Sequence, residues 1–557
     1  MTANSPMIAA GNAASVREPI DSQTQSLSLR AIVGPSVVLG FATAITMWVV
    51  WLIGHQPWLD LPASVSGPAM GLVVIVGALV AGVFGGRRLG WASGAIATLL
   101  AAILNLLIMG SLVSETIDGA APAQGSTGLT PSAGVAMLGF IAASLAGGAV
   151  FGLVGGFAKR TPTPRPATFW ASRFAIVAFV AVAPLLLLGG LVTSTGSGLA
   201  VPDWPGTYGA NMFLYPIALM ADPRIFLEHT HRLFGSLVGV TTIALAVFVW
   251  STAALRKKGD VVVSLATVLV IGSVLVVGLR MHMAEVLGGL TFGGVGVAVA
   301  IGTIAWFLVS LRHDRPAQAA AALILMVSAQ GVLGGTRVTE ANPALGTIHG
   351  VLGQAYFASM VMFAAWLSPA ARSLREIDRP RAWVRVGAGA LLVSLVFQLV
   401  MGAMYRHGSM AAEKTAWAGP ALYGHIGFSV VVVTLAAIVG FALMGQGTGP
   451  SADSDDPDEA RGARVCGRLG RLLFVAIILQ FVLGWVAFFL VTGGERRVVP
   501  TADQLADAAS VPAATALVTF AHQANGALLL ATTSAAIVWG GLVLASRKSP
   551  DVQPATA

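Results

Sequence analysis

Glu228 and His231 are the residues whose types and spacing most directly suggest chemistry. They stand three residues apart in the segment DPRIFLEHTHRLFG, which starts at Asp222 and opens a long apolar run. Asp222 suits a helix N-cap and Pro223 the first helical turn, so the segment is predicted to be a helix. Residues three apart share one helix face. A carboxylate and an imidazole on one face of a bilayer-spanning helix cost free energy and usually mark function.

Three more histidines, His349, His425 and His522, fall at comparable places near the start of apolar segments. Each is followed within about one turn by a small residue, as Gly235 follows His231. Two helices that each contribute an axial imidazole can hold a porphyrin edge-on, provided small residues leave room for the ring. A single histidine at a membrane interface is more often a hydrogen-bonded anchor, but with four in matching positions two heme sites become an equal alternative.

A short repeat precedes three of these histidines. A glutamine is followed four residues later by a glycine in Gln330 to Gly334, Gln398 to Gly402 and Gln480 to Gly484. Helix pairs with this signature predict two similar four-helix halves, each with one pocket. The first half would use His231 and His349, the second His425 and His522.

Composition defines the class of protein. The chain has 557 residues, of which 56% are hydrophobic and 10% charged, and its mean hydropathy is +0.82. These values predict an all-α polytopic membrane protein. The net charge of +8 comes from short basic clusters between apolar runs, which favours a cytoplasmic N-terminus and no nucleic-acid partner. With Cys466 as the only cysteine, neither an intrachain disulfide nor a cysteine-rich metal site can form.

A window of about 20 apolar residues per span gives about fourteen transmembrane helices. They cover roughly 31–54, 68–86, 91–113, 133–157, 174–192, 223–255, 261–278, 286–311, 317–335, 344–367, 386–403, 422–444, 472–491 and 518–545. We predict four parts: a cytoplasmic tail (1–30), an N-terminal four-helix membrane region (31–158), a first half (169–370) with an inserted helix pair (261–311), and a second half (383–548). The Pro-rich segment 159–166 is typical of a linker between the second and third parts.

The motif around Glu228 resembles a known family. Residues 228–232, Glu-His-Thr-His-Arg, fit the E-x-x-H-R signature of heme A synthases, and the loop GSGLAVPDWP at 196–205 resembles the glycine-rich loop of that family. The segments around His349, Arg406, His425 and His522 fit its later motifs less sharply. The resemblance covers about 169–545, as eight helices plus the inserted pair.

This resemblance implies a two-step oxidation of the C8 methyl group of heme O to the formyl group of heme A. By the same analogy, His231 and His349, with Arg232, would bind the substrate heme, and Glu228 would be catalytic. Glu228 could orient water or stabilise developing positive charge, or it could merely pair with Arg232. The implied roles of the remaining residues are as follows: His425, His522 and Arg406 bind a b-type heme that relays electrons, and Asp203 and Trp204 shape the loop over the substrate.

The resemblance also implies a setting and partners. These are the bacterial cytoplasmic membrane and its lipid, a heme O synthase, an unidentified electron donor, cytochrome oxidase assembly factors, and a second copy of the chain in a homo-oligomer. Some family members carry a cysteine pair in the outer loop, which this chain cannot form. The first four helices and the inserted pair have no counterpart in the minimal family pattern. A diheme electron-transfer protein that leaves its heme unmodified is the alternative. A transporter is not favoured, because broken helices and midplane charge pairs are missing from the pattern.

Overall fold

The computed structural model describes residues 20–59, 61–116, 127–162, 164–252, 316–373 and 382–543. Across these ranges the regular secondary structure is helical, apart from a hairpin of two short antiparallel strands, β1 (Ser114–Thr116) and β2 (Thr127–Leu129). Ten of the described helices are long and apolar enough to cross a membrane. The all-α polytopic membrane fold predicted from composition is therefore confirmed.

The N-terminal region contains α1 (Ile20–Gly54), α2 (Ala63–Leu112) and α3 (Ala133–Gly156). The 50-residue α2 comprises two predicted spans, because Gly86 breaks it with a φ of +62°, a conformation that favours glycine. The arms fold back on each other, so that a Cβ on Gly90 would lie 3.1 Å from the Gly82 carbonyl oxygen. α1 starts eleven residues before the predicted span, because an apolar window marks the membrane crossing and a helix can extend beyond it.

The first bundle contains α4 (Ala167–Thr195), α5 (Pro223–Ser251), α8 (Pro316–Thr339) and α9 (Pro343–Trp366). The connection between α4 and α5 includes two short 3₁₀ turns, η2 (Met212–Leu214) and η3 (Ile217–Met220). Asp222 caps α5 by accepting a hydrogen bond from the Arg224 backbone nitrogen at 2.8 Å, as its position predicted. The predicted helix pair at 261–311 lies outside the described residues.

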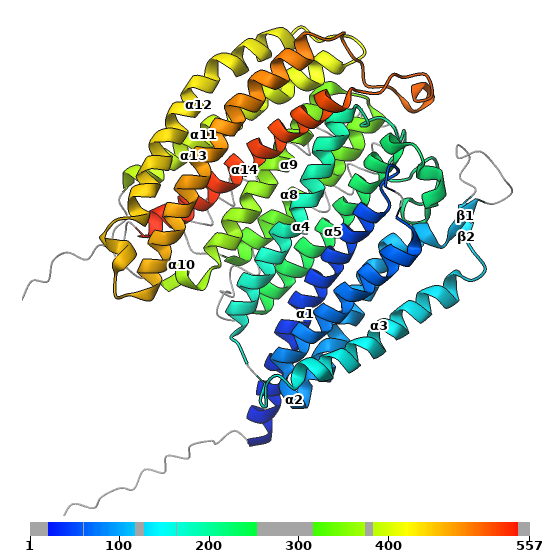
Figure 1. Ribbon diagram of the computed structural model, residues 1–557, viewed down its shortest axis with the longest axis vertical. Coiled ribbons are helices and arrows are strands. Elements are labelled where there is room, and N and C mark those ends of the chain that lie inside the picture. The colour runs from blue at the N-terminus through cyan, green and yellow to red at the C-terminus, as the bar shows by residue number, and fades with distance from the viewer. Residues whose placement is uncertain are drawn as a thin grey trace, which may run out of the picture.

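The second bundle contains four long helices, and two of them contact the first bundle. Its elements are α10 (Pro369–Ser373), α11 (Ala382–Met410), α12 (Ala418–Gly447), η6 (Pro450–Asp453), α13 (Pro457–Thr492), η7 (Ala502–Gln504) and α14 (Ala513–Val543). Both α11 and α14 pack against α9. The two bundles therefore adjoin along α9, α11 and α14, and the outer helices α12 and α13 lie farther away (Figure 1).

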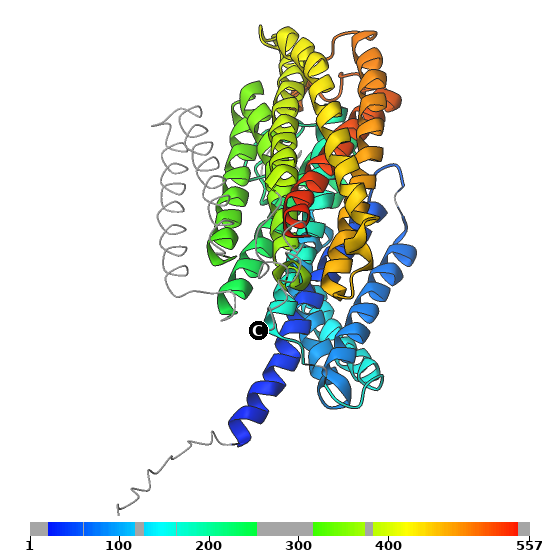
Figure 2. The same cartoon turned by 90° about the vertical axis from the view of Figure 1, so that its left-hand side faces the viewer.

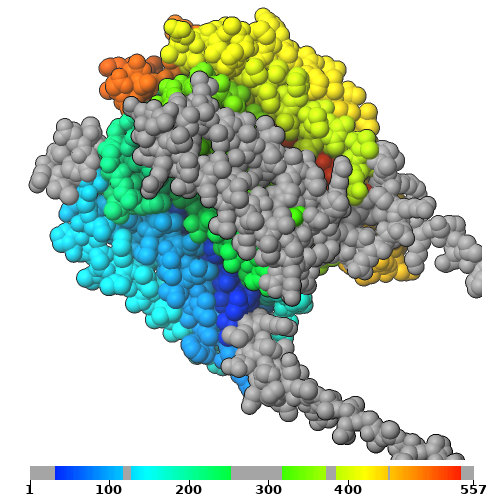
Figure 3. All heavy atoms as spheres, turned by 180° about the vertical axis from the view of Figure 1, so that it is seen from behind, coloured from blue at the N-terminus to red at the C-terminus, as the bar shows by residue number. Residues whose placement is uncertain are grey.

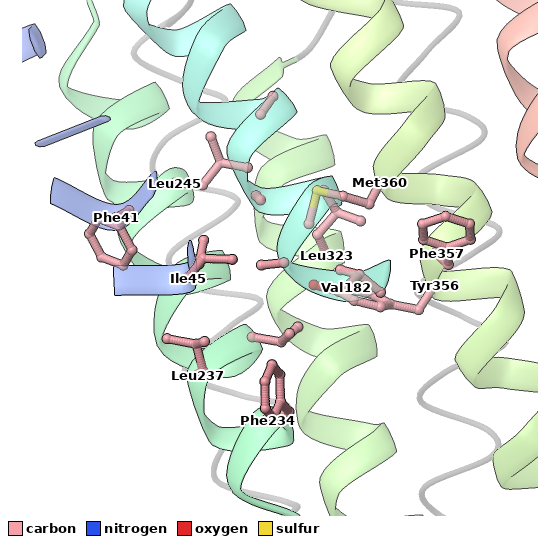
Figure 4. Packing of buried hydrophobic residues seen from close by; sticks show 14 of the residues in the cluster. Phe41, Ile45, Val182, Phe234, Leu237, Leu245, Leu323, Tyr356, Phe357 and Met360 are labelled. Atoms are coloured by element: carbon pink, nitrogen blue, oxygen red, sulfur yellow. The ribbon is translucent and has the colours of Figure 1, made fainter. Parts of the chain in front are cut away.

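The axes of the long helices are roughly aligned with one another, as expected for helices that cross one membrane (Figure 2). The N-terminal region and the second bundle lie on opposite sides of the first bundle (Figures 1 and 3). One apolar core extends from α1 into the first bundle, where Phe41 and Ile45 lie beside Leu237 of α5 (Figure 4). A separate core fills the second bundle.

Aromatic contacts attach α1 to the helix that carries Glu228 and His231. The Trp48 ring meets Phe234 edge-on at 5.3 Å, and Trp51 stacks on Phe226 at 6.1 Å. Both tryptophans are fully buried. Such pairs contribute about 0.5–1.5 kcal/mol each beyond burial alone. The N-terminal region therefore supports α5 from the side opposite the second bundle.

Candidate functional site

The four predicted histidines form two pairs. His231 on α5 faces His349 on α9, with ring centres 6.4 Å apart and planes at 87°. His425 on α12 faces His522 on α14, with ring centres 6.1 Å apart and planes at 72°. All four side chains are partly buried. The structure therefore brings together, in each half, the two histidines that the sequence placed on different helices.

The spacing within each pair suits an iron bound between two imidazoles. With a metal–nitrogen bond of about 2 Å and a ring centre about 1.1 Å behind the nitrogen, opposed imidazoles have centres about 6.2 Å apart. Among the described residues, no group of three or more His, Cys, Asp or Glu side chains could hold a metal ion by itself. Two nitrogen donors alone suit a metal that brings its other ligands with it, as heme iron does. Heme ligation by these pairs stays a prediction.

A glycine on a neighbouring helix makes room for each histidine ring. A Cβ at these glycines would lie only 2.9–3.2 Å from the histidine Cε1, in the pairs Gly189 with His231, Gly334 with His349, Gly402 with His425 and Gly484 with His522. Three of the glycines end the glutamine–glycine repeat seen in the sequence. The repeat therefore has a steric cause, because a side chain at the glycine would push the ring away.

Backbone carbonyls occupy equivalent places beside the four rings. The His425 Nδ1–H donates to the Gln398 carbonyl oxygen at 2.9 Å. The carbonyls of Leu185, Gln330 and Gln480 lie beside the rings of His231, His349 and His522, but the Nδ1 atoms of His231 and His522 make no hydrogen bond. Gly189 escaped the sequence analysis, because Leu185 stands where the other three helices have glutamine.

The glycine after His231 lies beside open space. Gly235 was expected to let a flat ligand approach the backbone, and a Cβ there would have nothing within 4 Å, so this expectation stays a prediction. The corresponding Gly353 and Gly526 lie beside the amide groups of Gln330 and Gln480, at 3.6 and 3.5 Å from a Cβ position. The tight contacts with the histidine rings thus come from the preceding helix and not from the histidine helix itself.

A cavity of about 280 Å³ surrounds the second pair. Its lining is mostly apolar and comes from α11, α12, α13 and α14, with Thr193 of α4 and Gly350 of α9 closing one side. Arg406 lines this cavity and donates to the Thr193 carbonyl oxygen at 2.7 Å. The neighbouring His407 packs against α9, where a Cβ on Gly346 would lie 2.9 Å from its Nδ1. A cation and an imidazole therefore stand where the two bundles meet.

Glu228 is buried in an ion-pair cluster. Its side chain is 2% exposed, and its two oxygens lie 3.3 Å from Arg232 Nε and 3.5 Å from Arg337 Nη2. The alternative in which Glu228 pairs with Arg232 is thus present in the structure, and its catalytic role stays a prediction. Arg337, whose Nη2 also donates to the Gly198 carbonyl oxygen at 3.0 Å, was missed. The sequence feature that could have identified Arg337 is its position one turn after Gly334, near the end of the helix whose glycine faces His349.

Arg232 holds the loop above α5. Its Nη1 donates to the carbonyl oxygens of Asp203 at 2.6 Å and Gly206 at 3.0 Å, and its Nη2 donates to that of Val201 at 2.8 Å. Three loop carbonyls and Glu228 occupy most of the five N–H donors of an arginine. The expected contact between Arg232 and a substrate heme stays a prediction, and the structure places its guanidinium against the loop.

Asp203 and Trp204 shape this loop from within. The Asp203 carboxylate accepts hydrogen bonds from the backbone nitrogens of Tyr208 at 2.7 Å and Gly209 at 2.9 Å. The Trp204 ring covers Gly335 of α8, next to the glycine that faces His349. Burial raises the pKa of Tyr208, so its hydroxyl stays protonated and donates to the Ala200 carbonyl oxygen at 2.5 Å. The loop therefore lies beside the first histidine pair.

Comparison with known proteins supports the resemblance seen in the motifs. The family model described as cytochrome oxidase assembly protein (COX15-CtaA) matches residues 172–286. Heme A synthase from Lysinibacillus sphaericus (strain C3-41) is 35% identical over 89 residues, which are 16% of this chain and 26% of that protein. No solved structure matches. The matched segment thus spans about a quarter of this relative's length.

These matches confirm the heme A synthase family as the one that this chain resembles. The family model begins in α4 and includes the loop with Asp203, and Glu228, Arg232 and His231 of α5, but not Arg337. His349, His425 and His522 lie beyond the matched residues. Their assignment depends on the geometry described above and on the sequence motifs.

Proposed function

We propose that this protein catalyses the heme A synthase reaction, in which the C8 methyl group of heme O is oxidised to a formyl group. The observation that carries the proposal is the presence of two histidine pairs, 6.4 and 6.1 Å apart, of which only the first adjoins a buried carboxylate among the described residues. This asymmetry supports a substrate heme in the first pocket and a b-type heme, relaying electrons, in the second.

The residues of the first pocket suit binding and charge stabilisation. His231 and His349 would hold the substrate heme, and the bound hemes would supply the redox chemistry. Glu228 lies near this pair, with Arg232 and Arg337 on either side of its carboxylate. A fixed carboxylate stabilises positive charge that develops nearby, or orients water, without reorganisation during the reaction.

The residues of the second pocket suit permanent binding of a cofactor. His425 and His522 would ligate the b-type heme inside an apolar cavity. Arg406 could also bind a heme carboxylate, since a guanidinium forms charge-assisted hydrogen bonds with carboxylates. The proposal places the protein in the bacterial inner membrane with its N-terminus in the cytoplasm. Its proposed partners are a heme O synthase that supplies the substrate, a separate electron donor, cytochrome oxidase assembly factors and a second copy of the chain.

One observation favours a second function, electron transfer without heme modification. The Glu228 carboxylate is already paired with two arginines, and the two histidine pairs have nearly equal spacing. Two similar hemes, with an ion-pair cluster at Glu228 that only stabilises the fold, would fit the same geometry.

Heme analysis separates the two functions. The chain is expressed with a heme O synthase in a host without its own heme A synthase, and the extracted hemes are separated by chromatography. Heme A or its alcohol precursor is expected in the wild type and should disappear in His349→Ala. Unmodified heme O and heme b alone, in a protein that binds both hemes, would refute the oxidation and select electron transfer.

A further inference from the structure

We propose that Leu185 makes the first pocket the exchangeable one. Three of the four histidines have a glutamine side chain from the neighbouring helix against their ring or backbone, and His231 has a leucine there. The inference deepens the proposed function and rests on it, because a substrate site must release its heme and a cofactor site must retain it.

Both histidines of the second pair have a glutamine side chain from the neighbouring helix within hydrogen-bonding distance. The Gln398 amide nitrogen donates to the His425 carbonyl oxygen at 2.7 Å. The Gln480 amide nitrogen lies 3.2 Å from His522 Nε2, and its oxygen accepts a hydrogen bond from Asn525 at 2.8 Å. Asn525 in turn donates to the Ala476 carbonyl oxygen at 2.8 Å. The second pocket therefore has three side-chain amides between its histidine helices and the helices beside them.

In the first bundle, one histidine has the same support. With the Gln330 amide nitrogen turned toward α9, it donates to the His349 carbonyl oxygen at 3.1 Å, and the amide oxygen accepts from the Gly353 nitrogen at 3.1 Å. The amide thus bridges the carbonyl and the N–H that are four residues apart on the histidine helix. Gly353 lacks a side chain, which leaves room for this bridge.

The fourth position, beside His231, has no amide. Leu185 precedes Gly189 by four residues, as Gln330 precedes Gly334, but a leucine can neither donate nor accept a hydrogen bond. The space beside Gly235 is open, whereas Gly353 and Gly526, at the equivalent positions, each face a glutamine side chain.

Ring nitrogens alone do not distinguish the pockets. The buried Nδ1 atoms of His231 and His522 both lack a hydrogen-bond partner. The Gln480 amide lies against His522 Nε2, the nitrogen that would bind iron, so its support of the liganded histidine comes through its bond with Asn525 on the same helix. Among the four histidines, His231 is therefore the one with no glutamine side chain against its ring or backbone, although Arg232 and Glu228 on the same helix bond to the loop and to Arg337.

Hydrogen bonds from the surroundings fix the orientation of a metal-binding histidine, and losing such a partner typically costs 10–100-fold in metal affinity. Of the four histidines, His231 is thus expected to bind iron most weakly. Because a bis-histidine site opens at its weaker ligand, heme should leave the first pocket much faster than the second. Leu185 is a positioning residue in this sense, since it acts through His231.

The test measures heme release and needs no oxidation. Purified protein loaded with heme b in both pockets is mixed with excess apomyoglobin, and heme transfer is followed by absorbance. The wild type should show a fast and a slow phase. Leu185→Gln should slow the fast phase about 10–100-fold and leave the slow phase unchanged. Gln398→Leu should accelerate the slow phase alone.

Two control variants separate the amide from other effects. Leu185→Met has nearly the shape of the glutamine variant without its hydrogen bonds, so its fast phase should match the wild type. Leu187→Gln introduces the same polar group on α4 at a side chain that is 40% exposed, and it should also leave both phases unchanged.

The possible outcomes are distinct. An unchanged fast phase in Leu185→Gln, or equal slowing in Leu185→Met, would overturn the role of Leu185. Failure of either pocket to bind heme would remove both the proposed function and this inference. Two release phases in a protein that never oxidises heme O would remove the proposed function and leave the difference between the pockets standing.

Discussion

Gly402→Ala tests whether the glycine on the neighbouring helix positions a heme-binding histidine. A Cβ at this position would lie 2.9 Å from His425 Cε1, where ordinary contact begins at 3.4 Å. The ring or its helix must therefore move by about 0.5 Å, which is the tolerance of a functional site. The Gln398 carbonyl that accepts the His425 Nδ1–H fixes the ring from the same helix, so the ring cannot retreat without losing that bond.

A displaced ligand should weaken heme binding in the second pocket by about 10–100-fold, as loss of second-sphere support does. The assay is titration of the heme-free protein with heme b, followed by its absorption spectrum. Gly389→Ala is the matched control, because it lies on the same helix with nothing within 4 Å of its Cβ position. Alanine should stabilise that helix by about 0.5–1 kcal/mol.

The result that would refute the reasoning is equal heme affinity and an unchanged spectrum in Gly402→Ala and Gly389→Ala. The contact between Gly402 and His425 would then be without consequence, and the steric explanation of the glutamine–glycine repeat would fail with it. A loss of heme in both variants would point instead to general damage to α11.

Four further predictions follow from the described contacts. Glu228→Gln should bind heme O but stall its oxidation, measured by heme chromatography; wild-type turnover would remove its catalytic role. Arg232→Lys keeps the positive charge but loses the guanidinium N–H groups that bond to three loop carbonyls. The loop between α4 and α5 should therefore be held less tightly, and limited proteolysis should cut it faster than in the wild type. Gly110→Val should disturb the same loop and lower its protection, because its side chain would meet the Phe213 carbonyl, whereas Gly134→Val, which has open space, should not. Asp222→Ala should cost about 1 kcal/mol through loss of the α5 cap. Burial alone would raise the pKa of Asp222, but the hydrogen bonds and charge of Arg224 outweigh it and hold the pKa below its ordinary 3.8. The charged cap thus stabilises the fold above about pH 4, and the difference between Asp222→Ala and wild type in thermal unfolding should shrink as the pH falls below that value.

Membrane spans and histidine positions were predictable from sequence because both are local properties. An apolar window of bilayer length marks a span wherever the helix later packs. For this reason the spans at 68–86 and 91–113 were predicted correctly, although they form the two arms of α2 around Gly86. Helix ends were less predictable. α13 begins at Pro457, well before the span predicted at 472, because Asp456 caps it outside the apolar window.

The sequence by itself determined the class of protein, the four histidines, the E-x-x-H-R signature and the repeat of glutamine and glycine. Only the tertiary structure decided which side chains meet: His231 with His349, Gly402 with His425, and Glu228 with Arg337. These contacts join helices far apart along the chain, so their existence depends on how the helices pack and not on any local spacing. The glutamines could be identified in the sequence. Their contacts with the histidine helices, and the absence of such a contact beside His231, could be seen only in the folded bundle.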